Sequence, residues 1–314
     1  MTVRKLIAKL TAGGGLGLLL LIAGHLVCRS TGDVPLNANP TAGTNIAQTT
    51  TQSNAPAPLP FTVQRDRIYN GGVSAVTNHE PLLADVYVPE TDPANNQLRP
   101  AVIVIHGGSW QRGDRGRMVA AATALAERGY VAVNIEYRLA PRYQYPAPLE
   151  DCRAAVRWVR ENAREWRVGP ARIGAFGYSA GGHLALLLAT THAGPGDVTG
   201  IQAVVAGAAP ADLSAFIENR PMKLLLGAGR DDAPELYRMA SPITHISPDD
   251  PPTFLYHGRD DWIVPVDQSR RMAHALRQNG VVVQIYESEQ GHLTAAVRNA
   301  AELSRAVDFL DQHL

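Results

Sequence analysis

From residue 82 onward, short apolar runs alternate with longer segments in which apolar residues recur every three or four positions. The run 101–105 is continuous and rich in β-branched residues, as expected of a strand that is buried on both faces of a sheet. The segment 82–88 alternates apolar and polar residues, which predicts a strand with one exposed face. Similar runs predict further strands at 130–135, 172–178, 201–205, 253–256 and 281–286.

The segments between these strands predict helices. Residues 147–166 are expected to form a helix whose buried face carries Leu149, Cys152, Val156 and Val159. Further helices are expected at 118–128, 180–191, 267–279 and 294–313. Because parallel strands need crossover connections, this alternation predicts an α/β fold with a mostly parallel central sheet and helices on both faces. Ligands of such sheets bind beyond the carboxyl ends of the strands.

The first 29 residues have a different pattern. Three basic residues precede an uncharged apolar run from about Ala12 to Cys28, which predicts a signal sequence or a retained membrane anchor. A lipid-modified Cys28 is an alternative, although Val27 stands where such signals carry a small residue. Each alternative places the rest of the chain outside the cytoplasm, in the periplasm or beyond the cell. Membrane contact is expected only through this segment.

Residues 30–60 predict a disordered linker. They carry one charged residue, Asp33, and no aromatic residue, and they are rich in Thr, Asn, Ala and Pro. Such a composition buries too little apolar surface to offset the entropy lost on ordering. The folded domain is therefore expected to span 61–314, with an extended segment at 61–84. A small cap insertion is one interpretation of residues 209–240.

Composition and charge exclude several functional classes. Lys and Arg total 29 and Asp and Glu total 29, so the chain has no excess positive charge and we expect no nucleic-acid partner. The two cysteines, Cys28 and Cys152, exclude a disulfide framework and a four-cysteine zinc site. No cluster of His, Cys and Glu has metal-ligand spacing, and we expect neither a metal nor an organic cofactor.

The strongest chemical motif is Gly177-Tyr178-Ser179-Ala180-Gly181, which lies between a predicted strand and a predicted helix. In that context the pattern is typical of a nucleophile elbow, a tight turn that presents a serine at the end of a strand. A serine nucleophile needs a base that is oriented by an acid, and in this fold the acid and then the histidine follow the serine along the chain.

Candidates for the acid and the base follow two later strands. Asp260 and Asp261 come after the strand 253–256, and His292 comes after the strand 281–286. We therefore predict Ser179 as the nucleophile, His292 as the base and Asp261 as the acid, with Asp260 as the competing acid.

Other residues are expected to bind the substrate around this centre. The amide of Ala180 and those of Gly107 and Gly108, in the loop after the strand 101–105, are the predicted donors of an oxyanion hole, since glycines let backbone amides approach the oxyanion closely. Trp110, Tyr178 and Trp262 are candidate substrate-binding residues, although packing would explain each of them equally well.

Together these motifs resemble α/β-hydrolases of the carboxylesterase and lipase kind, close to the hormone-sensitive-lipase-like and bacterial feruloyl-esterase-like groups. The resemblance covers nearly all of 61–314 and is carried by the stretches 106–110, 137–141, 145–151, 177–183 and 257–265. It implies a serine hydrolase that cleaves short- to medium-chain, aryl or acetyl esters of small molecules through an acyl-enzyme.

Three details refine the resemblance. The family pattern places its acid four residues after the histidine of the stretch that begins at His257, which selects Asp261. Ser109 stands where many members carry a third glycine, and the extended segment 61–84 leaves no helical cap before the first strand. Both departures favour the esterase-like group over the lipase-like group.

Two alternative functions remain open. An acyltransferase or a peptidase would use the same chemistry, but peptidases that resemble prolyl oligopeptidase carry a large N-terminal propeller, for which 60 residues are too few. A non-catalytic binding protein on this scaffold would be expected to lack the nucleophile, the acid or the base, and all three are present. No residue pattern indicates an oligomeric state.

Overall fold

The computed structural model describes residues 57–70, 73–74, 77–78, 80–90, 97–192, 196–295 and 300–314. The predicted signal or anchor at 1–29 and most of the predicted linker lie outside these ranges. Residues 57–60 of that linker are described and exposed, and the Leu59 amide donates a hydrogen bond of 2.8 Å to the Glu127 carbonyl. Within the described ranges, every helix is too short or too polar to cross a membrane.

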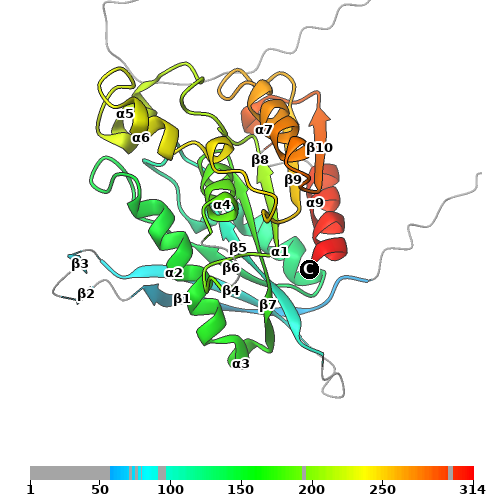
Figure 1. Cartoon of the computed structure of the whole chain (residues 1–314). Coiled ribbons are helices and arrows are strands. Elements are labelled where there is room, and N and C mark those ends of the chain that lie inside the picture. Colours follow the sequence, from blue (N-terminus) through cyan, green and yellow to red (C-terminus); the bar gives the residue numbers. More distant parts are fainter. Residues whose placement is uncertain are drawn as a thin grey trace, which may run out of the picture. The chain divides into compact units, whose positions relative to one another are not determined.

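Among the described residues, eight strands form the central sheet in the order β1-β4-β6-β5-β7-β8-β9-β10 (Figure 1). β1 runs antiparallel to β4, β4 runs antiparallel to β6, and the remaining neighbours are parallel. The predicted mostly parallel sheet is confirmed. The strands are β1 (Phe61–Asn70), β4 (Leu82–Pro89), β5 (Arg99–Ile105), β6 (Val131–Ile135), β7 (Val168–Tyr178), β8 (Ala203–Gly207), β9 (Thr253–Gly258) and β10 (Val283–Ser288). A separate two-stranded ribbon pairs β2 (Val73–Ser74) with β3 (Thr77–Asn78).

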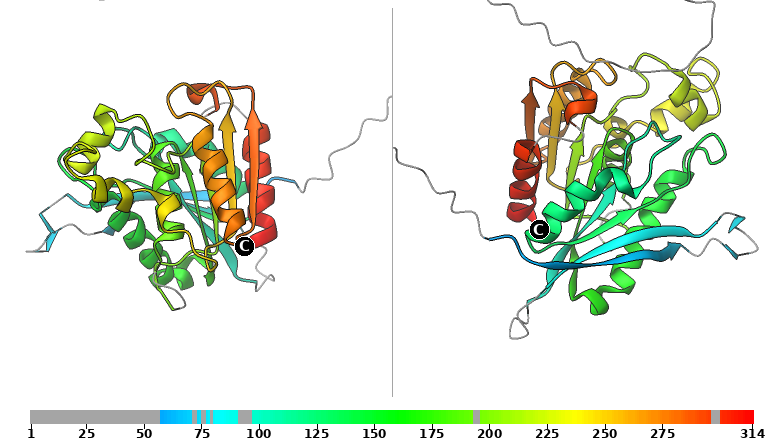
Figure 2. Two further views of the ribbon diagram at one scale, coloured as in Figure 1. Left: turned by 45° about the horizontal axis from the view of Figure 1, so that its top comes forward. Right: turned by 180° about the vertical axis from the view of Figure 1, so that it is seen from behind.

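Two apolar cores cover the two faces of this sheet, as β5 illustrates. Ile103 and Ile105 face one core, which contains side chains of α2 (Ala147–Glu161), α4 (Ala180–Thr190) and α7 (Asp267–Gln278). Val102 and Val104 face the other core, with α1 (Val119–Glu127) and α9 (Ala300–His313), which lie side by side in the right-hand view of Figure 2. The predicted placement of helices on both faces is therefore confirmed.

The prediction that the strand 82–88 has one exposed face is wrong. β4 lies inside the sheet between β1 and β6, and most of its side chains are buried. The polar residue that suggested an exposed face, Asp85, is only 7% exposed and pairs with the Arg115 guanidinium. The segment 61–70, predicted only as extended, forms the strand β1 that covers the outer edge of β4.

Several predicted boundaries shift by a few residues. The predicted helix 147–166 is divided at Asn162 into α2 and the short α3 (Ala163–Trp166). α1 starts at Val119 and follows a 3-10 helix at Arg115–Met118. The predicted helix 294–313 is α9, which starts at Ala300, and a separate short helix, α8 (His292–Ala295), follows β10.

The segment interpreted as a cap insertion follows β8 and contains α5 (Arg220–Leu226) and α6 (Pro234–Met239). Figure 1 shows both helices at the end of the sheet toward which the arrows of β8 and β10 point. The Gln268 side chain of α7 accepts hydrogen bonds from the Ala211 and Asp212 amides, at 2.9 and 2.8 Å. These bonds attach the start of the segment to α7, so that it covers the carboxyl ends of the strands.

Candidate active site

Ser179 occupies the tight turn between β7 and α4, with a φ of 54° and a ψ of −119°. A positive φ is costly for a residue with a Cβ and persists only where the surroundings enforce it. Here two glycines allow the close packing: a Cβ on Gly177 would lie 2.1 Å from the Gly181 carbonyl oxygen, and one on Gly181 would lie 2.1 Å from the Ile105 carbonyl oxygen. The predicted elbow geometry is therefore present.

The structure brings together the three residues predicted as nucleophile, base and acid. The His292 Nε2 atom lies 2.9 Å from the Ser179 Oγ atom, and the His292 Nδ1 atom lies 2.6 Å from the Asp261 Oδ2 atom. Because a carboxylate can only accept, Nδ1 carries the hydrogen of this bond. Nε2 is then free to accept the hydrogen of the serine hydroxyl.

The carboxylate of Asp261 is buried and fully engaged. Its Oδ1 atom accepts hydrogen bonds from the Ile263 and Val264 amides, at 2.9 and 2.8 Å. Burial alone would raise the pKa of Asp261, but the hydrogen bonds from His257, His292 and the Val264 amide outweigh it and hold this pKa well below its usual range. Asp261 is therefore charged at neutral pH. The competing acid, Asp260, is exposed.

His257 supports this carboxylate, a function that sequence reasoning missed. Its imidazole is fully buried, and its Nε2 atom lies 2.8 Å from the Val264 carbonyl oxygen and 3.3 Å from the Asp261 Oδ2 atom. Its Nδ1 atom lies 2.7 Å from the Ser269 hydroxyl of α7. The signal in the sequence is its position four residues before the acid, from which the family pattern counts.

The loop that carries Gly107 and Gly108 lies against the nucleophile. A Cβ on Gly107 would lie 3.2 Å from the Ser179 Cβ, and Gly108 has a φ of 135°. Ser109, the next residue, also has a positive φ of 57°. The backbone hydrogen bonds of the described residues leave the amides of Gly107, Gly108 and Ala180 unused. These three amides are thus available to a ligand beside the serine.

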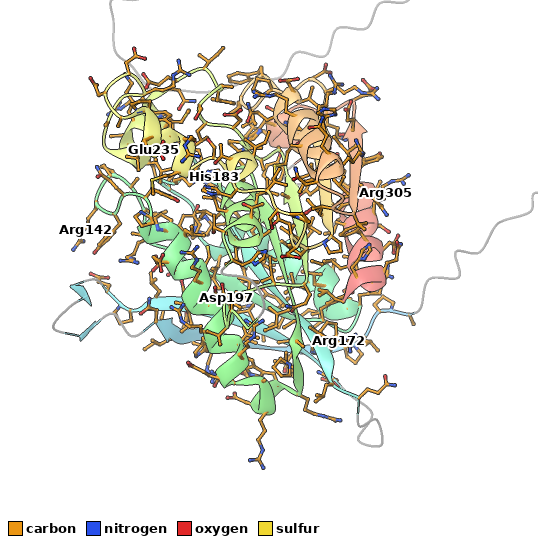
Figure 3. All side chains as sticks on the ribbon, viewed as in Figure 1. Arg142, Arg172, His183, Asp197, Glu235 and Arg305 are labelled. Atoms are coloured by element: carbon orange, nitrogen blue, oxygen red, sulfur yellow. The ribbon has the colours of Figure 1, made fainter. Side chains whose placement is uncertain are left out.

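Two buried histidines, His106 and His183, form hydrogen bonds in the part of the site that contains Ser179 and the glycine loop. The His106 Nδ1 atom lies 2.9 Å from the Gly107 carbonyl oxygen, and the His106 ring stacks on Tyr137 at 4.3 Å. His183, which lies on α4 (Figure 3), accepts a hydrogen bond of 3.1 Å from the Trp110 indole, and its Nε2 atom lies 2.7 Å from the Ala240 carbonyl oxygen at the end of α6. Burial lowers the pKa of each histidine to about 4, so both are neutral at neutral pH.

The three candidate substrate-binding residues occupy different positions. Trp110 is 4% exposed and lines a small cavity beside Ser179. Tyr178 lines a larger cavity, and its hydroxyl donates a hydrogen bond to the backbone carbonyl of His292. Trp262 is 83% exposed and lines neither of these cavities.

The two cavities meet at Ser179 and differ in size and lining. The smaller has a volume of about 70 Å³ and is lined mainly by apolar residues, including Trp110, Ala180, Pro210, Phe216, Met222 and Val264. The larger has a volume of about 290 Å³, and its lining includes Arg112, Arg117, Met118, Tyr178, His292 and Leu293. Residues 210–222 of the segment after β8 therefore form one wall of the site. In the part of the chain that the structure describes, no three His, Cys, Asp or Glu side chains form a group that could hold a metal ion.

Comparison with known proteins identifies the family. The BD-FAE family model matches residues 84–276, which include the elbow, the glycine loop and Asp261. The chain belongs to the BD-FAE family. Esterase LipQ of Mycobacterium tuberculosis is 32% identical over 238 residues, which cover 70% of this chain and 56% of LipQ. The matched part thus spans about half the length of that relative.

Solved structures of esterases share the fold. A truncated carbohydrate esterase from gut microbiota has a TM-score of 0.69 at 22% identity, and the match covers 83% of this chain and 99% of that one. An acetyl ester-xyloside bifunctional hydrolase from Caldicellulosiruptor lactoaceticus has a TM-score of 0.63 at 28% identity, over 73% of this chain and 86% of that one. The predicted α/β-hydrolase fold and the resemblance to its esterases are confirmed for this BD-FAE member.

Proposed function

We propose that this BD-FAE domain is a serine esterase that hydrolyses short-chain carboxylic esters through an acyl-enzyme. The observation that carries the proposal is the continuous chain of contacts from the Asp261 carboxylate through the His292 imidazole to the Ser179 hydroxyl. The names of two similar proteins, Esterase LipQ and the acetyl ester-xyloside bifunctional hydrolase, support it independently.

In the first half of the proposed reaction, the His292 Nε2 atom takes the hydroxyl proton while the Ser179 Oγ atom attacks the ester carbonyl carbon. The negative charge that develops on the carbonyl oxygen is stabilised by the amides of Gly107, Gly108 and Ala180. His292 then gives its proton to the alcohol oxygen as the carbon–oxygen bond breaks. The acyl group remains on Ser179.

In the second half, water takes the place of the alcohol. His292 accepts a proton from this water as its oxygen attacks the acyl carbon, and the same proton returns to Ser179 when the acid leaves. Throughout, the Asp261 carboxylate fixes the tautomer of the imidazole and stabilises its charged form. The low pKa of Asp261 keeps that carboxylate ionised whenever the imidazole is in use.

The smaller cavity sets the expected length of the acyl chain. One water-sized group occupies about 15 Å³ of such a space, so a volume of about 70 Å³ holds about five non-hydrogen atoms. Acetyl to butyryl groups fit this limit. Longer chains would have to displace Phe216 or Met222, which are buried.

Covalent labelling of the full chain with a fluorophosphonate tests the proposed nucleophile. We expect one adduct by mass spectrometry in the parent chain, no adduct in Ser179→Ala, and an unchanged adduct in Ser304→Ala, which alters an exposed serine on α9. A parent chain that takes up no label, or a label retained in Ser179→Ala, would contradict the proposal.

A series of p-nitrophenyl esters tests the reaction and its acyl preference. We expect kcat/KM to be highest from acetate to butyrate and to fall for longer chains. Analysis of products with an added alcohol separates hydrolysis, which yields the free acid, from acyl transfer, which yields a new ester.

A further inference from the structure

The lining of the larger cavity beside Ser179 includes positively charged residues and no negatively charged residue. Arg112 and Arg117, which are both exposed, line it together with Ser179 and His292. The chain as a whole has a formal net charge of zero, so this positive charge is local to the cavity. A cavity that is lined by two arginines and by a nucleophile, with no acidic residue, favours a ligand that carries negative charge.

Neither arginine is neutralised by a neighbour. No described carboxylate forms an ion pair with Arg112 or Arg117. Arg115, from the same loop, differs sharply, because its guanidinium contacts three carboxylates, those of Asp66, Asp85 and Glu136. Asp114, the only acidic residue of the segment 106–118, is exposed, and its carboxylate accepts a hydrogen bond from the Gly116 amide.

The position of His292 decides which part of an ester lies in this cavity. In the proposed reaction His292 protonates the leaving alcohol, so the alcohol must lie beside the imidazole. His292 lines the larger cavity and is absent from the lining of the smaller one. The alcohol portion therefore lies with Arg112 and Arg117, and the acyl portion lies in the smaller cavity, whose lining holds no charged side chain.

We propose that the enzyme prefers esters whose alcohol portion bears an anionic oxygen group, a carboxylate or a phosphate, which Arg112 and Arg117 bind. Guanidinium groups form paired hydrogen bonds with such oxygens. The proposal rests on the proposed esterase function and adds the charge of the alcohol to it. It also predicts that negative charge on the acyl portion gives no advantage.

Three aryl acetates with the same ring test this preference in the full chain: meta-acetoxybenzoate, neutral meta-acetoxybenzamide and cationic meta-acetoxyphenyl-trimethylammonium. The variants are Arg112→Gln, Arg117→Gln and the double variant, with Arg277→Gln as a matched control at an exposed arginine of α7. We expect the double variant to lower kcat/KM for the benzoate about tenfold or more, as for the loss of a hydrogen bond to a charged group. The ratio of the benzoate value to the benzamide value should fall by about the same factor, the cationic ester should be hydrolysed faster than by the parent chain, and Arg277→Gln should leave all three values close to those of the parent chain.

The acyl arm compares p-nitrophenyl hemisuccinate with p-nitrophenyl butyrate in the same variants, and we expect no loss specific to the hemisuccinate. Equal losses for the benzoate and the benzamide, or a benzoate value that the double variant leaves unchanged, would overturn the charge preference while ester hydrolysis stands. A loss confined to the hemisuccinate would overturn the assignment of the two cavities. A parent chain that hydrolyses none of these esters would overturn the proposed function, and the preference with it.

Discussion

Ser179 and His292 contact each other, yet the structure holds them in place by different means. Ser179 is positioned by backbone packing, because the turn around it is so tight that neither Gly177 nor Gly181 has room for a Cβ. His292 is positioned by side-chain hydrogen bonds, from its own imidazole to Asp261 and from the Tyr178 hydroxyl to its backbone carbonyl. The nucleophile half thus depends on close contact, and the acid–base half depends on polar partners.

This difference predicts in which half of the site a substitution reduces activity and stability together. A substitution in the nucleophile half disturbs the junction of β7, α4 and β5, which belongs to the core, so it should reduce folding and activity together. A substitution in the acid–base half changes a hydrogen-bond partner on loops at the end of β9 and β10. It should therefore reduce activity with a smaller effect on stability.

The largest effect is expected at Gly177. An added Cβ would lie 2.1 Å from the Gly181 carbonyl oxygen, and backbone cannot yield as a side chain can. We expect Gly177→Ala to lower the free energy of unfolding by about 4 kcal/mol or more and to abolish esterase activity. Denaturant unfolding and the p-nitrophenyl acetate assay measure the two effects.

A second glycine in the same strand supplies the matched control. For a Cβ on Gly169, the three nearest atoms all belong to the side chain of Arg172, the closest at 3.3 Å. Gly169→Ala should stay close to the parent chain in stability and activity. A Gly177→Ala variant that folds as well as Gly169→Ala and keeps its activity would show that contact does not position Ser179.

The next effect is expected at Asp261. Asp261→Asn retains the shape of the side chain but removes its charge and allows the wrong tautomer of His292, so we expect kcat to fall by about 10⁴-fold. The melting temperature should change far less than in Gly177→Ala. Asp260→Asn is the control and should leave kcat within about threefold, since that side chain is exposed. Equal losses in the two variants would contradict the assignment of the acid.

A smaller effect is expected at His257, which touches the acid and not the base. His257→Gln removes the contact of 3.3 Å to the Asp261 carboxylate and weakens the attachment to Ser269. A small displacement of a catalytic group can cost up to about 10²-fold, so we expect kcat to fall by about tenfold to a hundredfold. KM should hardly change if His257 positions Asp261, whereas a rise in KM with constant kcat would point to a different role.

The parts of the site that sequence could predict are those where the chemistry demands one residue type at one place. The strained turn requires glycines around Ser179, and the base and acid must follow later strands of a parallel sheet. Residue type and order therefore predicted His292 and the pair Asp260 and Asp261, and the resemblance to the family selected Asp261 from that pair. No residue pattern predicted the strand order, in which β4 lies between β1 and β6. Asp85 suggested an exposed face because its partner, Arg115, lies 30 positions away.

Features that depend on distant contacts escaped prediction. A cap insertion at 209–240 was one interpretation of the sequence, but the segment has short helices and little periodicity, so which of its residues line the smaller cavity could not be predicted. His183 and His257 are ordinary residues of their motifs until the fold places Trp110 beside one and Asp261 beside the other. Likewise, the charge of the larger cavity follows from which arginines of one loop find carboxylates, and Arg115 alone does so among Arg112, Arg115 and Arg117.

We expect the two halves of the site to lose stability in different pH ranges as the pH falls. Burial lowers the pKa of His106 and His183 from 6.5 to about 4, so protonation favours the unfolded state. Their contribution is complete above pH 6.5 and is lost as the pH falls from 6.5 toward 4. Asp261 behaves differently, because its depressed pKa contributes stability that is lost only below the unfolded value near 3.9. The window from pH 6.5 to 4 therefore tests the nucleophile half.

Within that window we expect the free energy of unfolding to fall steadily, by about 3 kcal/mol for each histidine, since one pKa unit corresponds to 1.36 kcal/mol. Urea unfolding at several pH values measures the slope. His183→Asn should show a shallower slope than the parent chain, and His274→Asn, which alters an exposed histidine on α7, should show the parent slope. A parent chain whose stability is constant across this window would mean that the two imidazoles bind protons equally well in the folded and unfolded states, which would contradict the expected effect of their burial.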